Sequence, residues 1–425
     1  MRKLFFIIMV FCSFLYSEKI STDSIKMAAS NFLNEKTSEI REVLSINESL
    51  DYSNIVIVNF TPSGFVVTSN DKQIVPILAY SSIGSIDYLN IPTHLKIKFS
   101  KYEDEINHSL HNNLVNSESY YMWERLINDD NPASTSRNVE PLITAKWDQG
   151  YPFNGMCPSG PPGSSMGTAV VGCVAVGMGQ LMHYWQHPPV GIGNHSYTHP
   201  NYGFLEADFG NTNYNFSNML DLSGNYEVQQ LLFHAGVSVE MDYGANGSGA
   251  AGGPFSPMDY PNAFSALQEN FGYSNDMQWL SKEDYPSSVW LSLVKEELDN
   301  LRPIAYDACA NVGCHFWNID GYEDDYLHCN WGWGGQGDGF YIYTALGPDD
   351  EPIVFDDEEF MIIGISPIEI FIEGDINSDT LVNIQDIILI VNLILISEYN
   401  NQADLNLDNT VDILDIVQII NIILN

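Results

Sequence analysis

The spacing of apolar positions in residues 18–138 changes along the segment, which predicts a small domain of mixed structure. Residues 21–44 carry apolar side chains at roughly helical intervals and predict a helix. The short apolar runs 54–60 and 64–68, joined by a Thr-Pro-Ser turn, predict two strands, and residues 74–80 predict a third. We therefore expect a small α+β domain that ends near Tyr121.

A long apolar run precedes this domain. Leu4–Tyr16 is almost wholly apolar, and Arg2 and Lys3 give it a positively charged start. This arrangement is typical of an export signal that is cut after Ser17; the alternative is a buried first helix. No later stretch is long and apolar enough to span a bilayer.

The composition changes after the polar, breaker-rich stretch 128–138, which predicts an exposed linker open to proteolysis. From about Pro141 the chain is rich in Gly, Trp and Tyr. Cys173–Trp185 predicts a helix that stops before two consecutive prolines. The Gly-rich stretch 243–254 predicts a loop without the spacing of a phosphate-binding motif. This second domain should end near Pro367, and its other predicted elements are a helix over 288–300 and strands over 304–306, 316–319 and 340–343.

The last part of the chain contains an internal repeat. Asp375–Leu395 and Asp404–Leu424 lie 29 residues apart, and each has an acidic, Asn-rich loop followed by an Ile/Leu/Val-rich helix. Calcium loops supply oxygen ligands from positions 1, 3, 5, 7, 9 and 12. Both loops match this pattern and predict calcium sites, the alternative being solvated acidic turns. The expected ligands are Asp375, Asn377, Asp379, the Leu381 carbonyl, Asn383 and Asp386 in the first loop, and Asp404, Asn406, Asp408, the Thr410 carbonyl, Asp412 and Asp415 in the second.

The net charge of −39 is unevenly distributed. Residues 1–138 contain 12 Lys and Arg and 16 Asp and Glu, whereas the rest of the chain contains 4 and 39. Such a surface repels nucleic acid and anionic lipid, so we exclude both as partners. Five cysteines remain once Cys12 leaves with the signal. An odd number in an exported protein leaves at least one thiol free or paired between chains, and the sequence leaves the pairing of Cys157, Cys309, Cys314 and Cys329 open.

Three separate segments carry candidate groups for thiol catalysis, which requires a thiolate, a nearby imidazole and donors for an oxyanion. Cys173 opens a predicted helix, where the helix dipole lowers the pKa of a thiol. His315 lies in an apolar strand that ends in Asp-Gly, and Asn330 follows fifteen residues later, where its side chain can accept the imidazole N–H. Each group alone has an ordinary alternative, namely a buried cysteine, a core histidine and a packed aromatic turn.

Together these segments make the chain resemble the streptopain-like cysteine peptidases, which have a papain-type fold. The resemblance extends from residue 18 to about residue 367. Its strongest motifs are Trp147–Asn154 (WDQGYPFN), Gly172–Ala175 (GCVA), Gly313–Gly321 (GCHFWNIDG) and Asn330–Gly334 (NWGWG).

The resemblance implies a role for each matching residue. Cys173 would be the nucleophile and His315 the acid–base, while the Gln149 side chain and the Cys173 backbone N–H would hold the oxyanion. Asn330 and Trp331 would orient and shield His315. Substrate-binding positions would be Ser248 in the Gly-rich loop and Gly313 and Cys314 before His315, with the Cys314 side chain facing away from the cleft. The resemblance also implies that residues 18–138 form an inhibitory propeptide and residues 139–367 the protease domain.

The tail, residues 372–425, resembles a type I dockerin. Thr380 and Asn409 occupy the loop position where Gly is usual, and apolar residues replace polar ones that cellulosomal dockerins often carry. The partner therefore stays open among a cohesin-like protein, the cell surface and the protease domain of the same chain. Calcium is expected to fold the tail, because its clustered carboxylates repel one another without metal.

The sequence as a whole predicts an α+β protein. A small α+β propeptide precedes a papain-like domain with a helical part and an antiparallel sheet or barrel part, and a small all-α calcium module follows. The expected function is that of a secreted or cell-surface cysteine endopeptidase made as a zymogen, which acts on proteins or peptides without a catalytic cofactor. The alternatives are a catalytically silent papain-like binding protein and an enzyme of the same fold with other thiol acyl chemistry.

Overall fold

The computed structural model describes residues 18–48, 52–112, 114, 117–130, 138–160, 167–254, 261–311, 313–345, 358–368, 373–377 and 381–424. The chain divides into two compact units, residues 1–367 and 368–425. The expected export signal, most of the expected linker and Asp379 lie outside the described residues. Within the described part of the chain, no helix has the length and apolar character needed to cross a bilayer.

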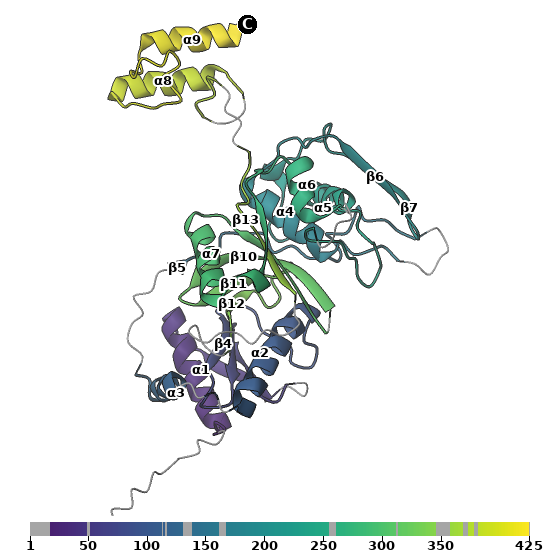
Figure 1. The fold of residues 1–425 in the computed structure, drawn as a ribbon, viewed down its shortest axis with the longest axis vertical. Coiled ribbons are helices and arrows are strands. Elements are labelled where there is room, and N and C mark those ends of the chain that lie inside the picture. Colours follow the sequence, from purple (N-terminus) through teal and green to yellow (C-terminus); the bar gives the residue numbers. More distant parts are fainter. Residues whose placement is uncertain are drawn as a thin grey trace, which may run out of the picture. The chain divides into compact units, whose positions relative to one another are not determined.

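The N-terminal part of the first unit is a four-stranded antiparallel meander between helices (Figure 1). Helices α1 and α3 pack on one face of these strands, and α2 covers the other. The predicted strands were located within three residues of their observed ends. The elements are α1 (Thr22–Thr37), β1 (Glu42–Glu48), β2 (Ile55–Thr61), β3 (Phe65–Ser69), β4 (Ile77–Ser81), α2 (Thr93–Asn112) and α3 (Ser117–Asn128).

One prediction for this part was wrong at its boundary. The helix expected to reach residue 44 ends at Thr37, and Ser38 adopts the left-handed conformation, with φ of 53°. The chain then turns and residues 42–44 begin β1, which pairs with β2. The apolar residues at 40, 43 and 44 continue the helical spacing by coincidence, and the local turn decides the end of the helix.

The strands β1 to β4 and most of the strands that follow residue 137 form a single antiparallel sheet. Its order is β1-β2-β3-β4-β12-β11-β10-β9-β13-β8, with β5 added beside β10. The join lies between β4 and β12, where Tyr80 pairs with Phe340 and Ala79 with Tyr341. The protease strands are β5 (Asn138–Val139), β8 (Gln278–Ser281), β9 (Ile304–Ala310), β10 (Gly313–Glu323), β11 (Tyr326–Asn330), β12 (Gly339–Ile342) and β13 (Glu359–Ile363).

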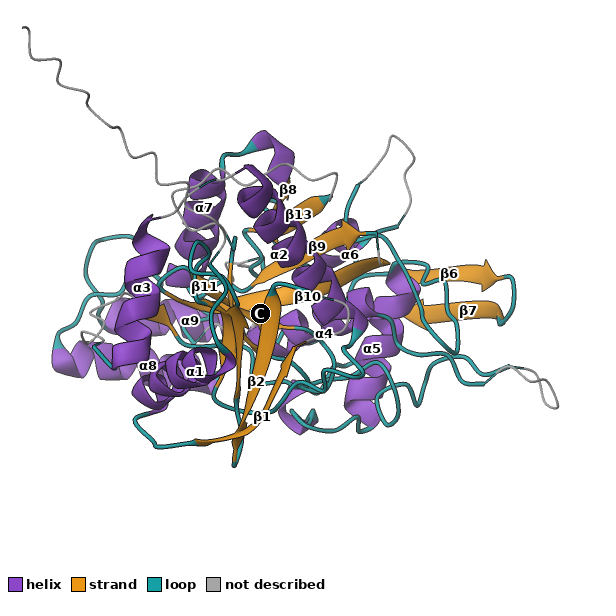
Figure 2. Cartoon of the chain, turned by 90° about the horizontal axis from the view of Figure 1, so that it is seen from below, coloured by secondary structure: helices purple, strands orange, loops and turns teal. Residues whose placement is uncertain are grey.

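Helices cover both faces of the protease strands (Figures 1 and 2). On one face α4 (Cys173–Trp185) packs against β10, with nearly all its residues buried, and α5 (Tyr226–Ser238) and α6 (Ala263–Glu269) surround it. On the other face lie α2 of the propeptide and α7 (Ser287–Asp299). A hairpin of β6 (Asn194–His199) and β7 (Gly203–Asp208) extends from the helical part. The helix predicted from residue 173 to residue 185 is confirmed at both ends.

The second unit is built from the repeat. Its two helices, α8 (Ile384–Ile396) and α9 (Ile413–Leu424), each follow an acidic loop and pack on a small core that includes Ile390 and Ile419. Asn383 caps α8 by accepting the backbone N–H of Gln385 at 2.8 Å. The expected all-α tail is therefore observed.

Candidate active site

Cys173 stands at the first residue of α4, where the chain makes a turn that requires glycine. Gly172 has φ of +92°, and a Cβ added there would lie 2.7 Å from Met241 Sδ and 3.2 Å from Ser248 Cβ. Side chains rarely adopt this conformation, and neighbouring atoms already fill the space. Gly172 thus allows the turn that places the Cys173 thiol at the start of the helix.

The thiol of Cys173 is uncharged in this structure. Burial raises its pKa to about 11, and the charge of Asp307 adds to this effect, although backbone hydrogen bonds from Phe316 and from Val174 oppose it. The N–H groups of Cys173 and Val174 at the helix start lower the pKa of the thiol, but burial outweighs them in this state. A neutral thiol is a poor nucleophile.

His315 lies on β10, and its ring lies beside His94 of α2. Its Nε2–H donates to the Trp331 carbonyl at 2.9 Å, and its ring is stacked on Trp317 with centroids 6.0 Å apart. His94 of α2 lies 5.6 Å from the His315 ring centroid and 5.5 Å from that of Trp333. No hydrogen bond or electrostatic interaction joins His315 to Cys173.

The two imidazoles are both held neutral. Burial lowers the pKa of His315 to about 4, and burial together with the nearby His315 lowers the pKa of His94 well below its usual value. His94 Nε2 is 3.1 Å from the Gln336 carbonyl, which ties α2 to the turn after Trp331. Helix α2 thus packs His94 against the expected base, and both imidazoles are uncharged.

Asn330 does not accept the imidazole N–H in this structure. Its Oδ1 accepts from Gln180 Nε2 at 3.0 Å, and its Nδ2 donates to the Ala145 carbonyl at 3.0 Å. The Oδ1 also accepts the Gly332 N–H at 3.3 Å. Both lone pairs of Oδ1 are used by these buried partners, so Asn330 fastens the turn that presents the Trp331 carbonyl. That carbonyl accepts the imidazole N–H in place of the amide.

The other predicted residues lie near Cys173 or at the end of its neighbouring strand. The Gln149 carbonyl accepts the Val171 N–H at 2.9 Å, two residues from the nucleophile, and its buried side-chain amide makes no hydrogen bond to any described residue. Ser248 Oγ donates to the Val170 carbonyl at 2.7 Å. Gly313 and Cys314 are exposed at the start of β10.

The cysteine pairing that the sequence left open is settled by strand register. Cys309 of β9 and Cys314 of β10 are direct cross-strand partners, and they form a disulfide. Cys157, Cys173 and Cys329 are free thiols. The disulfide closes the hairpin directly before His315.

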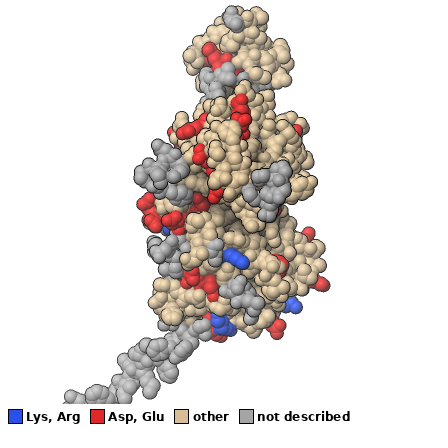
Figure 3. Space-filling model, turned by 90° about the vertical axis from the view of Figure 1, so that its right-hand side faces the viewer, with Lys and Arg blue, Asp and Glu red and all other residues tan. Residues whose placement is uncertain are grey.

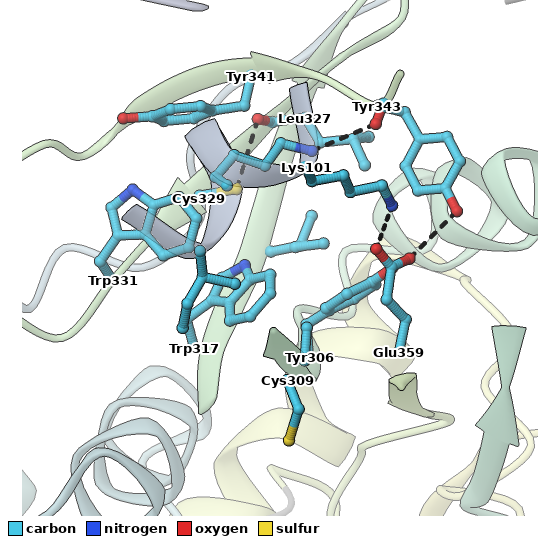
Figure 4. A pocket seen from close by; sticks show the side chains of 14 residues that line it. Lys101, Tyr306, Cys309, Trp317, Leu327, Cys329, Trp331, Tyr341, Tyr343 and Glu359 are labelled. Carbon is cyan, nitrogen blue, oxygen red and sulfur yellow. Dashed lines mark hydrogen bonds and ion pairs between the residues drawn. The ribbon is translucent and has the colours of Figure 1, made fainter. Parts of the chain in front are cut away.

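Propeptide helix α2 and the protease sheet enclose a cavity between them (Figure 4). Lys101 reaches from α2 and forms an ion pair with Glu359, and the two side chains are only 14% and 8% exposed. Lys98 donates to the Tyr343 carbonyl at 3.2 Å, and burial lowers its pKa to about 8. The N-terminal part of the first unit is therefore attached to the part after residue 137 by buried charged contacts as well as by the shared sheet.

Each acidic loop of the tail is closed by hydrogen bonds to its last expected calcium ligand. Asp415 Oδ1 accepts the Leu405 and Asn406 N–H groups at 2.8 and 3.2 Å, and Asp386 does the same for the first loop. Asn409 adopts φ of 66°, which asparagine tolerates, so the missing glycine is no obstacle in the second loop. Thr380 of the first loop lies outside the described residues. Among the described residues, no three His, Cys, Asp or Glu side chains gather closely enough to hold a metal by themselves. The donors are all oxygens, as calcium prefers.

Three family models match successive parts of the chain. Residues 17–106 match the Spi protease inhibitor, residues 147–341 the Peptidase C10 family, and residues 373–424 the dockerin type I domain. The first two matches lie in the first compact unit, whose sheet they share, and the third coincides with the second unit.

Individual relatives agree with these matches. Streptopain of Streptococcus pyogenes serotype M28 is 30% identical over 333 residues, covering 72% of this chain and 77% of that protein. The thiol protease/hemagglutinin PrtT of Porphyromonas gingivalis is 26% identical over 327 residues, covering 72% of this chain and 36% of that protein. The structure of a Prevotella intermedia prointerpain A fragment superposes with a TM-score of 0.60 at 26% identity, covering 76% of this chain and 98% of that chain.

The last of these neighbours is itself a precursor, which agrees with the propeptide contacts seen here. The combination of an inhibitor-like N-terminal part, a papain-like domain and a dockerin also agrees with the two units and the shared sheet. The chain thus belongs to the peptidase C10 family of cysteine proteases, and it carries an inhibitory propeptide and a C-terminal dockerin domain.

Proposed function

We propose that Cys173 is the nucleophile of this cysteine protease, that His315 is its general acid–base and that Gln149 donates to the oxyanion. The observation that carries this assignment is the thiol at the start of α4, which accepts backbone hydrogen bonds from Phe316 and Val174. Hydrolysis of an unfolded protein by wild type and by Cys173→Ala tests it.

The mechanism begins with departure of the propeptide. Once α2 and His94 leave, the His315 ring is free to turn toward Cys173 and take its proton. The thiolate attacks the peptide carbonyl, and the Gln149 amide and the Cys173 N–H hold the oxyanion. The imidazolium then protonates the departing amine, and a water molecule deprotonated by His315 hydrolyses the thioester.

The roles of the remaining residues follow from their contacts. Asn330 positions the Trp331 carbonyl through the buried network with Gln180, and Trp331 packs beside His315 and shields it from water. Ser248 fastens the Gly-rich loop to the segment before Cys173, where this loop would form one wall of the substrate cleft. The backbone of Gly313 and Cys314 would form another edge, and the disulfide holds it in place.

Activation is expected to require a cut between Tyr121 and Pro141, after which the mature protease begins. The cut should fall between the end of α3 at Asn128 and the start of β5 at Asn138, because residues on either side are held in hydrogen-bonded elements and a protease needs an extended segment. N-terminal sequencing of the mature form checks this. A start well inside either folded part would contradict it.

We propose that the tail binds two calcium ions. The residues that would hold them are the expected ligands of each loop, of which Asp375 and Asp404 are already buried at the loop starts. Bound calcium would supply the positive charge that allows these carboxylates to lie together. The tail would then attach the enzyme to a cohesin-like protein or to the cell surface.

Removal of calcium is expected to melt the tail and to spare most of the peptidase activity. Far-UV circular dichroism should show loss of the α8 and α9 signal on addition of a chelator, because the acidic loops repel one another without metal. The catalytic groups all lie in the other unit, so peptide hydrolysis should stay within about twofold of its starting value. Parallel loss of both signals would show that the two units are not separable.

Secretion is part of the proposal. The apolar N-terminal run after two basic residues supports export, and the Cys309–Cys314 disulfide fits an oxidising compartment. The proposed substrates are proteins or peptides outside the cell, with the propeptide as the inhibitor of its own enzyme.

A further inference from the structure

The carboxylate of Asp307 lies close to the proposed nucleophile, and the proposed mechanism gives it no role. Asp307 of β9 is the cross-strand partner of Phe316, whose backbone hydrogen-bonds to the Cys173 thiol. The charge of Asp307 acts on that thiol. Asp307 is only 7% exposed. Its carboxylate therefore lies on the Cys173 side of the sheet, within electrostatic reach of the reacting sulfur.

The Gly-rich loop faces this carboxylate at a position where only glycine fits. A Cβ added at Gly252 would lie 2.5 Å from Asp307 Oδ2 and 3.0 Å from the Phe316 ring. Gly253 packs equally closely against Trp279, because an added Cβ would lie 2.4 Å from its indole. Two adjacent glycines thus bring the backbone of the loop up to Asp307 without covering it with a side chain.

Asp307 has no partner of its own. Among the described residues, no hydrogen bond or ion pair to its carboxylate is present, and burial followed by the charge of Glu358 raises its pKa to about 7. Buried carboxyl groups in folded proteins are normally paired or hydrogen-bonded. An unpaired one that faces a loop beside a nucleophile is available to a charged group of a bound substrate.

The basic side chains of the protease domain are all engaged with groups other than Asp307. The whole chain after residue 138 contains four basic residues, and each is already engaged at another site: Lys146 with Asp338, Lys295 with Asp325, Arg302 with Glu297, and Lys282 with the Tyr285 carbonyl. On the face shown in Figure 3, acidic side chains far outnumber basic ones. Such a surface attracts cationic peptides before they bind.

We propose that Asp307 and the backbone of Gly252 form a specificity pocket that accepts a Lys or Arg side chain of the substrate beside Cys173. The proposal rests on Cys173 being the nucleophile. A bound cation supplies the missing partner of the carboxylate. It also offsets the negative charge that opposes the Cys173 thiolate, so the correct side chain assists formation of the nucleophile as well as binding.

The test uses the full-length precursor after activation and a peptide library in which each position around the cut carries lysine or norleucine, which match in length but not in charge. At one position, wild type should cut the lysine peptides with the higher kcat/KM. Asp307→Asn should lower kcat/KM for those peptides by about 30-fold or more, the loss expected when one partner of a buried ion pair is removed. Norleucine peptides should be cut as well as before or better.

Glu358→Gln is the matched control, because Glu358 is the neighbouring acid but lies exposed on the surface. It should change the lysine preference by no more than about threefold, as expected for a screened surface charge. Equal loss for both peptides in Asp307→Asn, or faster cutting of norleucine peptides by wild type at every position, would overturn the pocket. Activity retained by Cys173→Ala would instead overturn the nucleophile assignment, so the two failures are distinguishable.

The lysine preference should also depend on pH. The titratable groups that act on or are affected by Asp307 are Cys173 and Glu358, and the described neighbours Phe316, Phe360 and Gly252 do not titrate. Since the pKa of Asp307 is raised, its carboxyl is neutral at low pH and ionises as pH rises through about 7. The ratio of kcat/KM values for lysine and norleucine peptides should therefore rise over this range, because titration of Cys173 and His315 cancels in the ratio. A ratio independent of pH would contradict the role of this carboxylate.

Discussion

The Cys173→Ala precursor is expected to remain at its full length and to hydrolyse no peptide above background. The thiol is the only candidate nucleophile at the start of α4, and loss of a nucleophile typically lowers kcat by a factor on the order of 10⁴ or more. Gel electrophoresis over time, beside wild type in reductant, reports processing. Hydrolysis of an unfolded protein reports catalysis.

Cys157→Ala is the matched control for this change. Cys157 is another free thiol, is buried in the same core and lies outside the proposed chemistry. The Cys157→Ala precursor should process itself and cut substrate like wild type. A small amount of active wild type added to Cys173→Ala should shorten it if the cut is made between molecules. If Cys173→Ala shortens itself alone and then cuts substrate, the nucleophile lies elsewhere.

Lys101→Met is expected to release the propeptide and to shorten the lag before self-activation. Lys101 and Glu359 form an ion pair across the propeptide–protease interface, and both side chains are largely buried. Removal of one partner of a buried pair costs about 3–5 kcal/mol, because the other charge is left without compensation. Nearby Lys98 interacts with Glu359 and reduces this cost. We therefore expect the propeptide to bind at least tenfold more weakly, on the order of 1.4 kcal/mol.

The lag before peptidase activity appears, and the affinity of the released propeptide for the mature enzyme, both measure this effect. Lys72→Met is the control, because its ion pair with Glu18 lies within the propeptide, with side chains 32% and 56% exposed. Exposed pairs contribute little to stability, so its lag should match that of wild type. Equal lags for Lys101→Met and wild type would show that the shared sheet alone holds the propeptide.

Local signals were sufficient for the elements that carry the nucleophile. The apolar period of residues 173–185, the glycine before them and the prolines after them define α4, because helix ends depend on neighbouring residues. The repeat in the tail likewise predicted two loop–helix units, since each loop carries its own ligands and its own cap. The propeptide helices α2 and α3 and the hairpin β6–β7 were not predicted, although α2 supplies His94.

Contacts between distant residues decided the state of the site. Asn330 was expected to accept the imidazole N–H because its spacing from His315 fits, but Gln180, 150 residues earlier, takes that oxygen. His94 is 221 residues from His315, and no local pattern connects the two. The register between β9 and β10 places Cys309 opposite Cys314, and it places Asp307 on the side of the sheet that faces the Cys173 thiol.

The sequence by itself therefore determined the kind of protein. Short motifs are enough to recognise the residue types for thiol chemistry, the order of the three parts and the oxygen ligands of the tail. Only the tertiary structure decided that the chain is held inactive, with a neutral thiol, a neutral imidazole and a propeptide joined to the protease sheet. Burial sets these protonation states, and burial depends on which distant segments pack together.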